Sequence, residues 1–452
     1  MTKEKETKNT LALLDGDKTV TSERPDLFAW PIITERHEQA VLDVLRYRQM
    51  SGIELTRQFE KNYAQALGRK YGLAYHNGTA AILGAMYGLG IGLGDEVICP
   101  SITYWASVAQ AYTLGATPVF ADVDPETICI DPADIEHRIT PRTKAIVVVH
   151  YAGMPAEMDA IMKMAGKHHL KVLEDASHAH GALYKGKEVG TFGEAAAFSL
   201  MTGKALAVGE AGILFTDDRE VYERAILFGH YIRHDEITLE KLKPYAGLPS
   251  GGFKHRMHQL SSAFGLVQLE LYPKQMAEID KAMNYFCDLL EDAPGIQPIR
   301  PAKGTETTKG GWYYPHFRYL AEELGGLSLS RFSQAVQAEG SICNPGCNKP
   351  LHLHPLFTKQ DVYGHGRPTR IAFLDDSATI DQYVQKLPIA EGINRRVFEI
   401  PWFKHYEPEI IAEHAGAYRK VVENYQALLA GDTDKDADTG GYSSFFSSRK
   451  NT

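Results

Sequence analysis

Residues 196–212 read AAFSLMTGKALAVGEAG. The small and apolar run that ends at Phe198 and Ser199 predicts a buried strand, and a loop that carries Lys204 follows it. A buried ammonium group costs several kcal/mol unless it is paired or neutralised. A lysine pKa lowered from about 10.4 leaves a neutral amine, which can attack a carbonyl carbon. This stretch therefore predicts a reactive lysine just beyond the end of a strand.

The chain on either side of this stretch alternates short apolar runs with segments of helical spacing. The runs predicted as strands cover 73–76, 96–99, 117–123, 145–150, 171–175, 195–200 and 212–216. The segments with helical spacing cover 79–89, 105–114, 155–169 and 219–228. Strands alternating with helices are typical of an α/β domain whose mostly parallel sheet is covered on both faces. The sequence thus predicts a large α/β domain around a seven-stranded, mostly parallel sheet.

Four parts are expected along the chain. They are a polar N-terminal tail over 1–25, a large domain with leading helices over 26–275, a smaller α+β domain over 276–430, and a disordered low-complexity tail over 431–452. The leading helices are predicted over 35–50 and 55–67, and a long helix over 261–290 is expected to link the domains. The smaller domain is predicted to hold a strand over 312–319 and helices over 330–339 and 408–429.

Composition narrows the function classes. The net charge of −9 and the pI near 6.1 give no support for nucleic-acid binding, which usually shows as a basic domain or stripe. Five scattered cysteines argue against a disulfide framework, and Cys343 and Cys347 lack a second ligand pair, so no metal site is predicted. No run approaches the roughly 18 apolar residues of a membrane span, and the N-terminus has no signal-peptide core. A cytoplasmic protein that binds neither nucleic acid nor membrane is expected.

The turn after the first predicted strand has the features of a phosphate site. Ligands of open α/β sheets bind outside the carboxyl ends of the strands, so these ends deserve inspection first. Gly78 and Thr79 open the helix that follows, where free backbone N–H groups, a hydroxyl and the positive end of the helix dipole suit a phosphate. Taken alone, Thr79 is more often an ordinary helix cap.

Aromatic and acidic residues follow two further strands. Tyr104 comes after the second strand, where it would either stack on a planar ring or pack in the core. Asp175 ends the fifth strand, where a buried carboxylate needs a cation, and a protonated pyridine nitrogen would be such a cation. Glu174 should point to the opposite face of the sheet, because strand side chains alternate. His178, in the next turn, is a candidate contact for a ring oxygen.

Ser199 and Lys204 complete the set with a hydroxyl for a phosphate and an amine for an aldehyde. A phosphate cup, an aromatic residue, an aspartate, a serine and a lysine occur in this order at successive strand ends. Each signal is weak alone, but the ordered set predicts pyridoxal 5′-phosphate as the cofactor.

Four strings carry a close resemblance to a known family: HNGTAA at 76–81, PSITYWAS at 100–107, LEDASHAHGA at 173–182 and FSLMTGK at 198–204. They resemble the DegT/DnrJ-type keto-sugar aminotransferases, and the similarity runs from about residue 28 to about residue 429. The resemblance implies the fold type I architecture of pyridoxal phosphate enzymes, with a large domain and a smaller C-terminal α+β domain. It also implies a homodimer whose active sites lie at the subunit interface.

The resemblance assigns roles residue by residue. Lys204 matches the Schiff-base lysine, and Asp175 matches the partner of the pyridine nitrogen. The other cofactor-binding positions match Gly78, Thr79 and Ser199 for the phosphate, Tyr104 for stacking on the ring, and His178 near the ring oxygen.

Three candidates come with alternatives. The family commonly has an Asn-Tyr-Arg string that reaches the phosphate of the other subunit, and Lys254 stands here in the asparagine position as a candidate point charge. Tyr151 and His352 are candidate substrate residues by resemblance, with a packing role or a solvated loop equally open for each.

Within the family, HAHGA at 178–182 and the segments 229–247 and 254–258 look most like the scyllo-inosose (cyclitol) aminotransferases. This resemblance implies ping-pong transfer of an amino group from glutamate or glutamine to a cyclic ketone, either a keto-cyclitol such as scyllo-inosose or a keto-sugar. The alternatives are a pyridoxal phosphate-dependent dehydratase, a 3-amino-5-hydroxybenzoate synthase, and a non-catalytic regulator with the same fold. Lys204 favours amino transfer, since dehydrating relatives carry histidine at that position.

Overall fold

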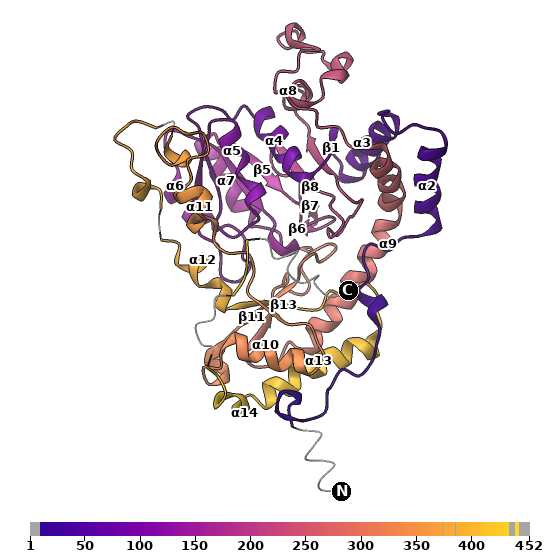
Figure 1. Cartoon of the computed structure of the whole chain (residues 1–452), viewed down its shortest axis with the longest axis vertical. Helices are drawn as coiled ribbons and strands as arrows, with labels where there is room; N and C mark the ends of the chain where they lie inside the picture. Colours follow the sequence, from indigo (N-terminus) through magenta and orange to yellow (C-terminus); the bar gives the residue numbers. More distant parts are fainter. Residues whose placement is uncertain (1–9, 373, 385, 434–438, 443–452) are drawn as a thin grey trace.

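The computed structural model describes residues 10–372, 374–384, 386–433 and 439–442. Two sheets organise it, a seven-stranded one and a four-stranded one, and they lie one above the other in Figure 1. The α9 helix, Gln259–Leu289, runs along one side of the molecule from the large domain to the smaller one. This arrangement confirms the predicted architecture of a mostly parallel sheet plus a smaller C-terminal domain.

The large sheet contains all the strands predicted for it. They are β1 (Tyr71–Tyr75), β2 (Glu96–Pro100), β3 (Thr117–Ala121), β4 (Thr143–Val149), β5 (Lys171–Asp175), β8 (Ala195–Ser199) and β9 (Gly212–Thr216). Their spatial order is β1-β9-β8-β5-β4-β2-β3. The β9 strand runs antiparallel to both neighbours, and the other pairs are parallel. The residues that follow β1, β2, β5 and β8 therefore meet at one edge of the sheet.

Helices surround this sheet. They are α2 (Glu35–Arg46), α3 (Glu54–Leu67), α4 (Gly78–Gly88), α6 (Pro132–Arg138), α7 (Met158–His168) and α8 (Arg219–Gly229). The α4 helix consists almost wholly of small and apolar buried residues, because it packs against β1, β8 and β9 on one side and α8 on another. It is thereby held with its N-terminus at the strand-end edge.

The helix predicted over 105–114 is wrong as a single element. The structure has a short 3-10 turn at Trp105–Ser107 and then α5 at Gln110–Thr113. Val108, between them, has φ −141°, which is outside the helical range. The break leaves Ser107 free to hydrogen-bond Asp175.

The smaller domain is built on an antiparallel sheet. Its order is β10 (Ile296–Pro298), β11 (His316–Tyr319), β13 (Val397–Glu399) and β12 (Asn344–Pro345). Around it lie α10 (Leu329–Ala338), α13 (Pro408–Glu423) and α14 (Gln426–Leu429), and aromatic side chains such as Phe317 and Tyr418 fill the core. The strand predicted over 312–319 is shortened to β11, because Trp312 and Tyr314 have φ of 55°, a left-handed conformation.

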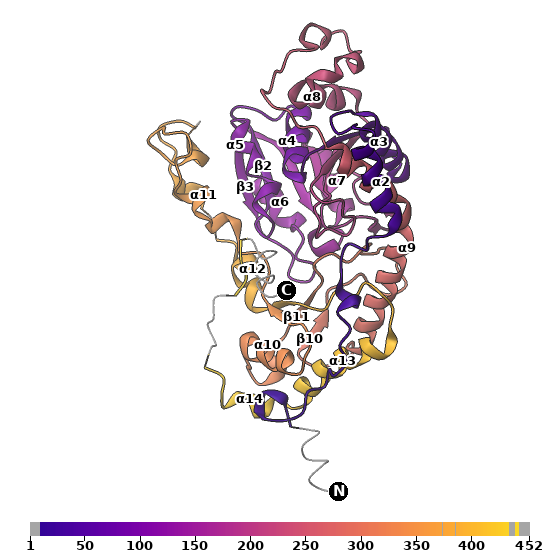
Figure 2. The same ribbon diagram turned by 45° about the vertical axis from the view of Figure 1, so that its right-hand side comes forward.

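Several short elements lie outside these two sheets. The hairpin β6 (Leu183–Tyr184) and β7 (Lys187–Glu188) follows β5, and α11 (Pro355–Thr358) and α12 (Pro388–Gly392) precede β13. Figure 2 shows the segment around α11 projecting from one side of the molecule. None of these elements was predicted from the sequence, because each is too short to show a period.

The two predicted tails are only partly described. Residues 10–25 pack on the smaller domain: Leu11 is buried in its core, and the Thr19 hydroxyl donates a hydrogen bond to Glu339 Oε2 at 2.7 Å. Residues 1–9 of the first tail, and 434–438 and 443–452 of the second, lie outside the described residues. Residues 439–442 lie beside the loop that contains Cys347 and Lys349. Within the described ranges, no helix is long and apolar enough to cross a membrane.

Candidate active site

A cavity of about 400 Å³ opens at the strand-end edge of the large sheet. Its lining includes seven predicted cofactor residues: Gly78, Thr79, Tyr104, Asp175, His178, Ser199 and Lys204. The other described lining residues are Asn77, Ile82, Thr103, Ala106, Ser107, Ser177, Met201, Glu210, Tyr313, Tyr314 and Asn348. The smaller domain supplies the last three, so the cavity lies between the two domains.

One corner of the cavity is formed by the start of α4 and the end of β8. Asn77 caps α4 by accepting a hydrogen bond from the Ala80 N–H at 2.9 Å, so that the helix begins at Gly78. A Cβ atom on Gly78 would lie 2.6 Å from Ser199 Cβ. Glycine therefore lets the helix N-terminus approach Ser199, and the backbone N–H groups and two hydroxyls gathered there suit a phosphate.

Asp175 lies at the end of β5 with its carboxylate fixed on both oxygens. Ser107 Oγ donates to Oδ2 at 2.7 Å, and the Ser177 N–H donates to Oδ1 at 3.2 Å. The side chain is only 5% exposed. A buried carboxylate with two neutral donors still favours a cation nearby. Asp175 is therefore suited to hold a protonated nitrogen.

Glu174 points to the opposite face of β5, as predicted from strand alternation. It accepts hydrogen bonds from the backbone N–H groups of Gly190, Phe192 and Gly193, each at 2.7 Å, and contacts His150 Nε2 at 3.1 Å. Burial opposes the charged form, but these hydrogen bonds outweigh it and lower the pKa of Glu174. Glu174 therefore serves the packing of the β7–β8 turn and not the cavity.

Lys204 is buried in the loop after β8. Its Nζ lies 4.1 Å from the centre of the Tyr313 ring, and its backbone oxygen accepts a hydrogen bond from Trp30 Nε1 at 2.8 Å. Burial lowers the pKa of Lys204 to about 7, and the negative charge of Asp175 partly opposes this shift. A substantial fraction of the amine is thus neutral at neutral pH, which is the form that attacks an aldehyde.

His178 lies between Tyr313 and the backbone of Ala152. Its Nδ1 accepts the Ala152 N–H at 3.3 Å, and its ring centre is 4.6 Å from that of Tyr313. Burial, together with the charge of Lys204, holds the pKa of His178 well below its usual range, so the ring is neutral. With Nδ1 used as an acceptor, the proton lies on Nε2, which can donate to an oxygen in the cavity.

Three predicted residues lie elsewhere. Tyr151 is fully buried, and its hydroxyl donates to Asn348 Oδ1 at 2.7 Å. His352 is buried between Ser101 and Glu391. Neither is among the described lining residues, so their positions favour the packing alternative over direct substrate contact. Lys254 is exposed and also does not line the cavity of its own chain.

The sequence did not point to three of the lining residues: Ser107, Tyr313 and Asn348. Ser107 falls inside a stretch of helical spacing, which hides its contact with Asp175. Tyr313 and Asn348 belong to irregular segments of the smaller domain, where no strand end marks a position. The aromatic pair at 313–314 was the one available signal.

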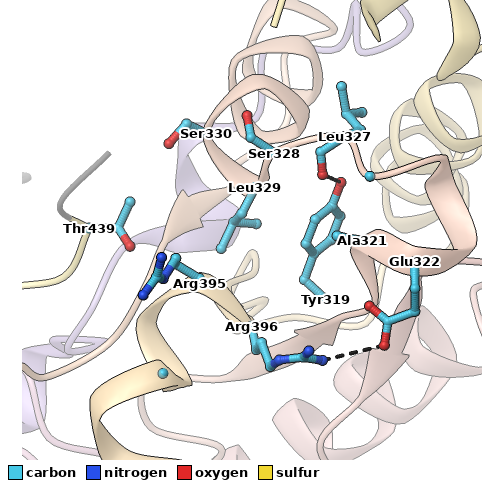
Figure 3. Close-up of a pocket in the computed structure, with 12 residues that line it drawn as sticks. Tyr319, Ala321, Glu322, Leu327, Ser328, Leu329, Ser330, Arg395, Arg396 and Thr439 are labelled. Atoms are coloured by element: carbon cyan, nitrogen blue, oxygen red, sulfur yellow. Dashed lines mark hydrogen bonds and ion pairs between the residues drawn. The ribbon is translucent and has the colours of Figure 1, made fainter. Parts of the chain in front are cut away.

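A second cavity, of about 380 Å³, lies in the smaller domain (Figure 3). Arg396 contacts Glu322 at 3.4 Å there, and Tyr319 Oη donates to the Leu327 carbonyl at 2.9 Å. The described residues around it include none of the predicted site residues. Glu322 and Arg396 pair with each other there, and we therefore look for the chemistry of the site in the first cavity.

Residues 31–390 match the family model described as DegT/DnrJ/EryC1/StrS aminotransferases. The chain belongs to this family. Two family members are similar over nearly their whole length. The L-glutamine:scyllo-inosose aminotransferase of Streptomyces griseus is 31% identical over 433 residues, covering 93% of this chain and 99% of that enzyme. The L-glutamine:2-deoxy-scyllo-inosose aminotransferase of Micromonospora echinospora is 31% identical over 437 residues, covering 93% and 99%.

Solved structures agree with the assignment to the DegT/DnrJ/EryC1/StrS family. An aminotransferase from Psychrobacter cryohalolentis superposes with a TM-score of 0.76 at 27% identity, covering 88% of this chain and 99% of that one. The chain is therefore a pyridoxal phosphate-dependent aminotransferase of fold type I. This confirms the predicted family, fold class, enzyme class and cofactor.

The residues present fit pyridoxal phosphate. The corner at Gly78 is a cradle that a Cβ atom would fill. Asp175 is a buried carboxylate whose hydrogen-bond donors among the described residues, Ser107 and Ser177, are both neutral. Tyr104 is 40% exposed and offers its ring to the cavity, where a flat heteroaromatic ring would cover it. The cavity thus offers a suitable group for each part of the cofactor: the corner at Gly78 for the phosphate, Asp175 and Tyr104 for the ring, and Lys204 for the aldehyde.

We expect Gly78→Ala to weaken retention of pyridoxal phosphate by at least about tenfold and to lower the free energy of unfolding by about 1–3 kcal/mol, because the new methyl group forces Ser199 or α4 to move. Equilibrium dialysis and urea denaturation measure the two effects. Gly166→Ala in α7 is the control, since a Cβ atom there meets nothing within 4 Å. Wild-type affinity in Gly78→Ala would contradict the phosphate corner.

Proposed function

We propose that this aminotransferase moves the α-amino group of glutamine, or of glutamate, to a cyclic polyhydroxylated ketone by a ping-pong mechanism. The observation that carries the proposal is the end-to-end similarity to two enzymes named as glutamine-dependent scyllo-inosose and 2-deoxy-scyllo-inosose aminotransferases. The cavity supports it, because polar side chains such as Glu210, Tyr314 and Asn348 surround the reactive lysine. A keto-cyclitol is the proposed acceptor, and a keto-sugar is the second possibility.

Each residue of the site has a separate role in the proposed amino transfer. Pyridoxal phosphate, when bound, supplies an aldehyde for the amino group and an electron-withdrawing ring. We assign Lys204 Nζ as the group that holds the aldehyde at rest and then moves a proton at the substrate carbon, a role suited to a pKa near 7. Asp175 would hold a protonated ring nitrogen, and the Nε2–H of His178 would be available to the ring oxygen. Gly78, Thr79 and Ser199 would hold the phosphate.

The acceptor is tested with the amino-loaded enzyme. Enzyme treated with glutamine and freed of it by gel filtration is offered keto-cyclitols, nucleotide-linked keto-sugars and keto-sugar phosphates in parallel. The proposal predicts that a cyclitol ketone returns the absorbance to the lysine-bound form fastest. If a nucleotide-linked keto-sugar reacts fastest, the acceptor is a keto-sugar and not a cyclitol. If a dehydrated product forms, the proposal of amino transfer is wrong.

We further propose a homodimer with shared active sites. Lys204 is the one lysine or arginine among the described residues that line the cavity, so a dianionic phosphate there lacks a dedicated cation. Lys254, exposed on its own chain and standing where the family places a cross-subunit residue, would supply that charge to the partner. We also propose a cytoplasmic location, which the five free and buried cysteines support.

Mixed dimers test the sharing. Lys204→Ala and Lys254→Ala chains are each expected to be weak or inactive alone. Half of the dimers in an equal random mixture pair one of each, and each such dimer has one intact site, so activity should return to about a quarter of wild type. Activity that stays at the level of the separate variants would show that Lys254 serves its own subunit or neither.

A further inference from the structure

Asn348 belongs to the smaller domain, and several hydrogen bonds hold it in place beside the cavity. It lines the cavity, is 6% exposed, and lies in the loop that follows β12. The resemblance to the family assigns it no role, and its side chain accepts a hydrogen bond from the predicted substrate residue Tyr151. Its hydrogen bonds therefore bear on what the cavity offers to an acceptor.

The Tyr151 hydroxyl fixes the orientation of the Asn348 side-chain amide. The backbone N–H of Asn348 donates to Tyr151 Oη at 3.3 Å, so the hydroxyl acts there as an acceptor. The hydroxyl proton then points to Asn348 Oδ1, 2.7 Å away. With its oxygen used, the amide has only its Nδ2 hydrogens left, and no described residue accepts a hydrogen bond from Nδ2. Asn348 thus presents an unused donor.

The backbone around Asn348 is held from the other side. Asn394 Oδ1 accepts the Cys347 N–H at 2.6 Å, and Asn394 Nδ2 donates to the Asn348 carbonyl at 3.2 Å. Both bonds come from one side chain that is 8% exposed. The peptide unit that carries Asn348 therefore has little freedom to turn.

Residues 439–442, which we call the C-terminal segment, add a third support. The segment pairs with the loop as a parallel bridge: the Gly441 N–H donates to the Cys347 carbonyl, and the Lys349 N–H donates to the Gly441 carbonyl, both at 3.1 Å. Thr439 Oγ1 also donates to the Asn394 carbonyl at 2.7 Å. Gly441, about 90 positions further along the chain, thus hydrogen-bonds the residues on both sides of Asn348.

We propose that the Asn348 amide is a specificity-determining donor to an oxygen of the cyclic acceptor, and that the C-terminal segment positions it. This rests on the proposed function, since it names a contact with that acceptor. A ring bearing many oxygens gains from a fixed donor, and an acceptor lacking the matching oxygen would leave the buried amide unpaired. Tyr151 and Asn394 act as positioning residues and touch no substrate.

The donor is tested by Asn348→Leu, which keeps the branched shape and removes the amide. We expect the KM for the ketone, and the Kd of myo-inositol measured by calorimetry on the cofactor-loaded protein, to rise about 5- to 50-fold, the loss of one well-placed hydrogen bond. The rate of the glutamine half-reaction should change less than about twofold, because the donor amino acid reacts without this contact. Wild-type KM and Kd in Asn348→Leu would overturn the inference.

The C-terminal segment is tested by Gly440→Ala in the full chain. Gly440 has φ 82°, and a Cβ atom there would lie 2.3 Å from Asn394 Oδ1 and 2.5 Å from the Cys347 carbonyl. Gly304→Ala is the matched control, with φ 78° but nothing within 4 Å. We expect a rise of about 3- to 10-fold in the ketone KM for Gly440→Ala alone, with kcat kept, and no further rise when it is combined with Asn348→Leu.

Two failures are distinguishable. If the wild-type enzyme aminates no cyclic polyhydroxylated ketone, the proposed function fails and the contact fails with it. If the wild-type enzyme aminates one, but Gly440→Ala behaves like Gly304→Ala or adds fully to Asn348→Leu, the proposed function stands and the positioning role of the segment is overturned.

Discussion

Lys204→Ala is expected to lower kcat by at least about 10³-fold, because it removes both the amine that binds the cofactor aldehyde and the base that moves the proton. Lys204 is buried beneath Tyr313 with a pKa of about 7, and no other lysine is among the described lining residues to replace it. Borohydride reduction followed by peptide mass spectrometry should find the cofactor on Lys204 in the wild type and on no lysine in the variant.

Two further variants sharpen this result. Lys204→Arg keeps a cation in the loop but cannot form the covalent bond, and it should be as inactive as the alanine variant. Lys163→Ala, at an exposed position of α7, is the control and should leave kcat unchanged. If Lys204→Ala turned over at a rate near that of Lys163→Ala, the assignment of Lys204 would be refuted.

Asp175→Asn should lower kcat by about 10²- to 10³-fold, the scale expected when a preorganised electrostatic group is lost from a buried site. The amide keeps the shape of the side chain but carries no charge to hold a proton on the ring nitrogen. The absorbance of the bound cofactor should report the loss through an altered pH titration, while circular dichroism confirms the fold.

Ser107→Ala is the graded comparison for Asp175→Asn. It removes the 2.7 Å hydrogen bond to Oδ2 but keeps the carboxylate charge. Loss of one such bond costs about 1–1.4 kcal/mol, so kcat should fall by about fivefold to tenfold. An Asp175→Asn variant no weaker than Ser107→Ala would mean that the charge of Asp175 is not needed.

The large domain and its share of the site could be predicted because its strands show as short apolar runs and its site residues stand directly after them. The strands of the large sheet are short apolar runs, and the parallel topology places the residues after β1, β2, β5 and β8 at one edge of the sheet. Gly78, Asp175 and Lys204 therefore converge although about 125 residues separate the first from the last. The cofactor site could therefore be predicted from the order of the strands along the chain, without the exact residue at which each strand ends.

The smaller domain's contribution could not be predicted, for a physical reason. Tyr313 lies between Trp312 and Tyr314, two non-glycine residues with φ of 55°, a conformation that local sequence rarely signals. Asn348 is held by Tyr151, Asn394 and the C-terminal segment, which are distant in sequence and have no shared period. Tertiary contacts decide such positions, so only the structure brings them to the cavity.

The central claim is that this cavity carries an amino group from glutamine to a cyclic ketone in two separate steps. The most direct measurement loads the enzyme with glutamine labelled with ¹⁵N at its α-nitrogen, removes free amino acid by gel filtration, and then adds the ketone. We predict that the label stays with the protein through filtration and appears in the amine product at about one label per site. An enzyme that retains no label, or a ketone that leaves without nitrogen, would contradict the claim.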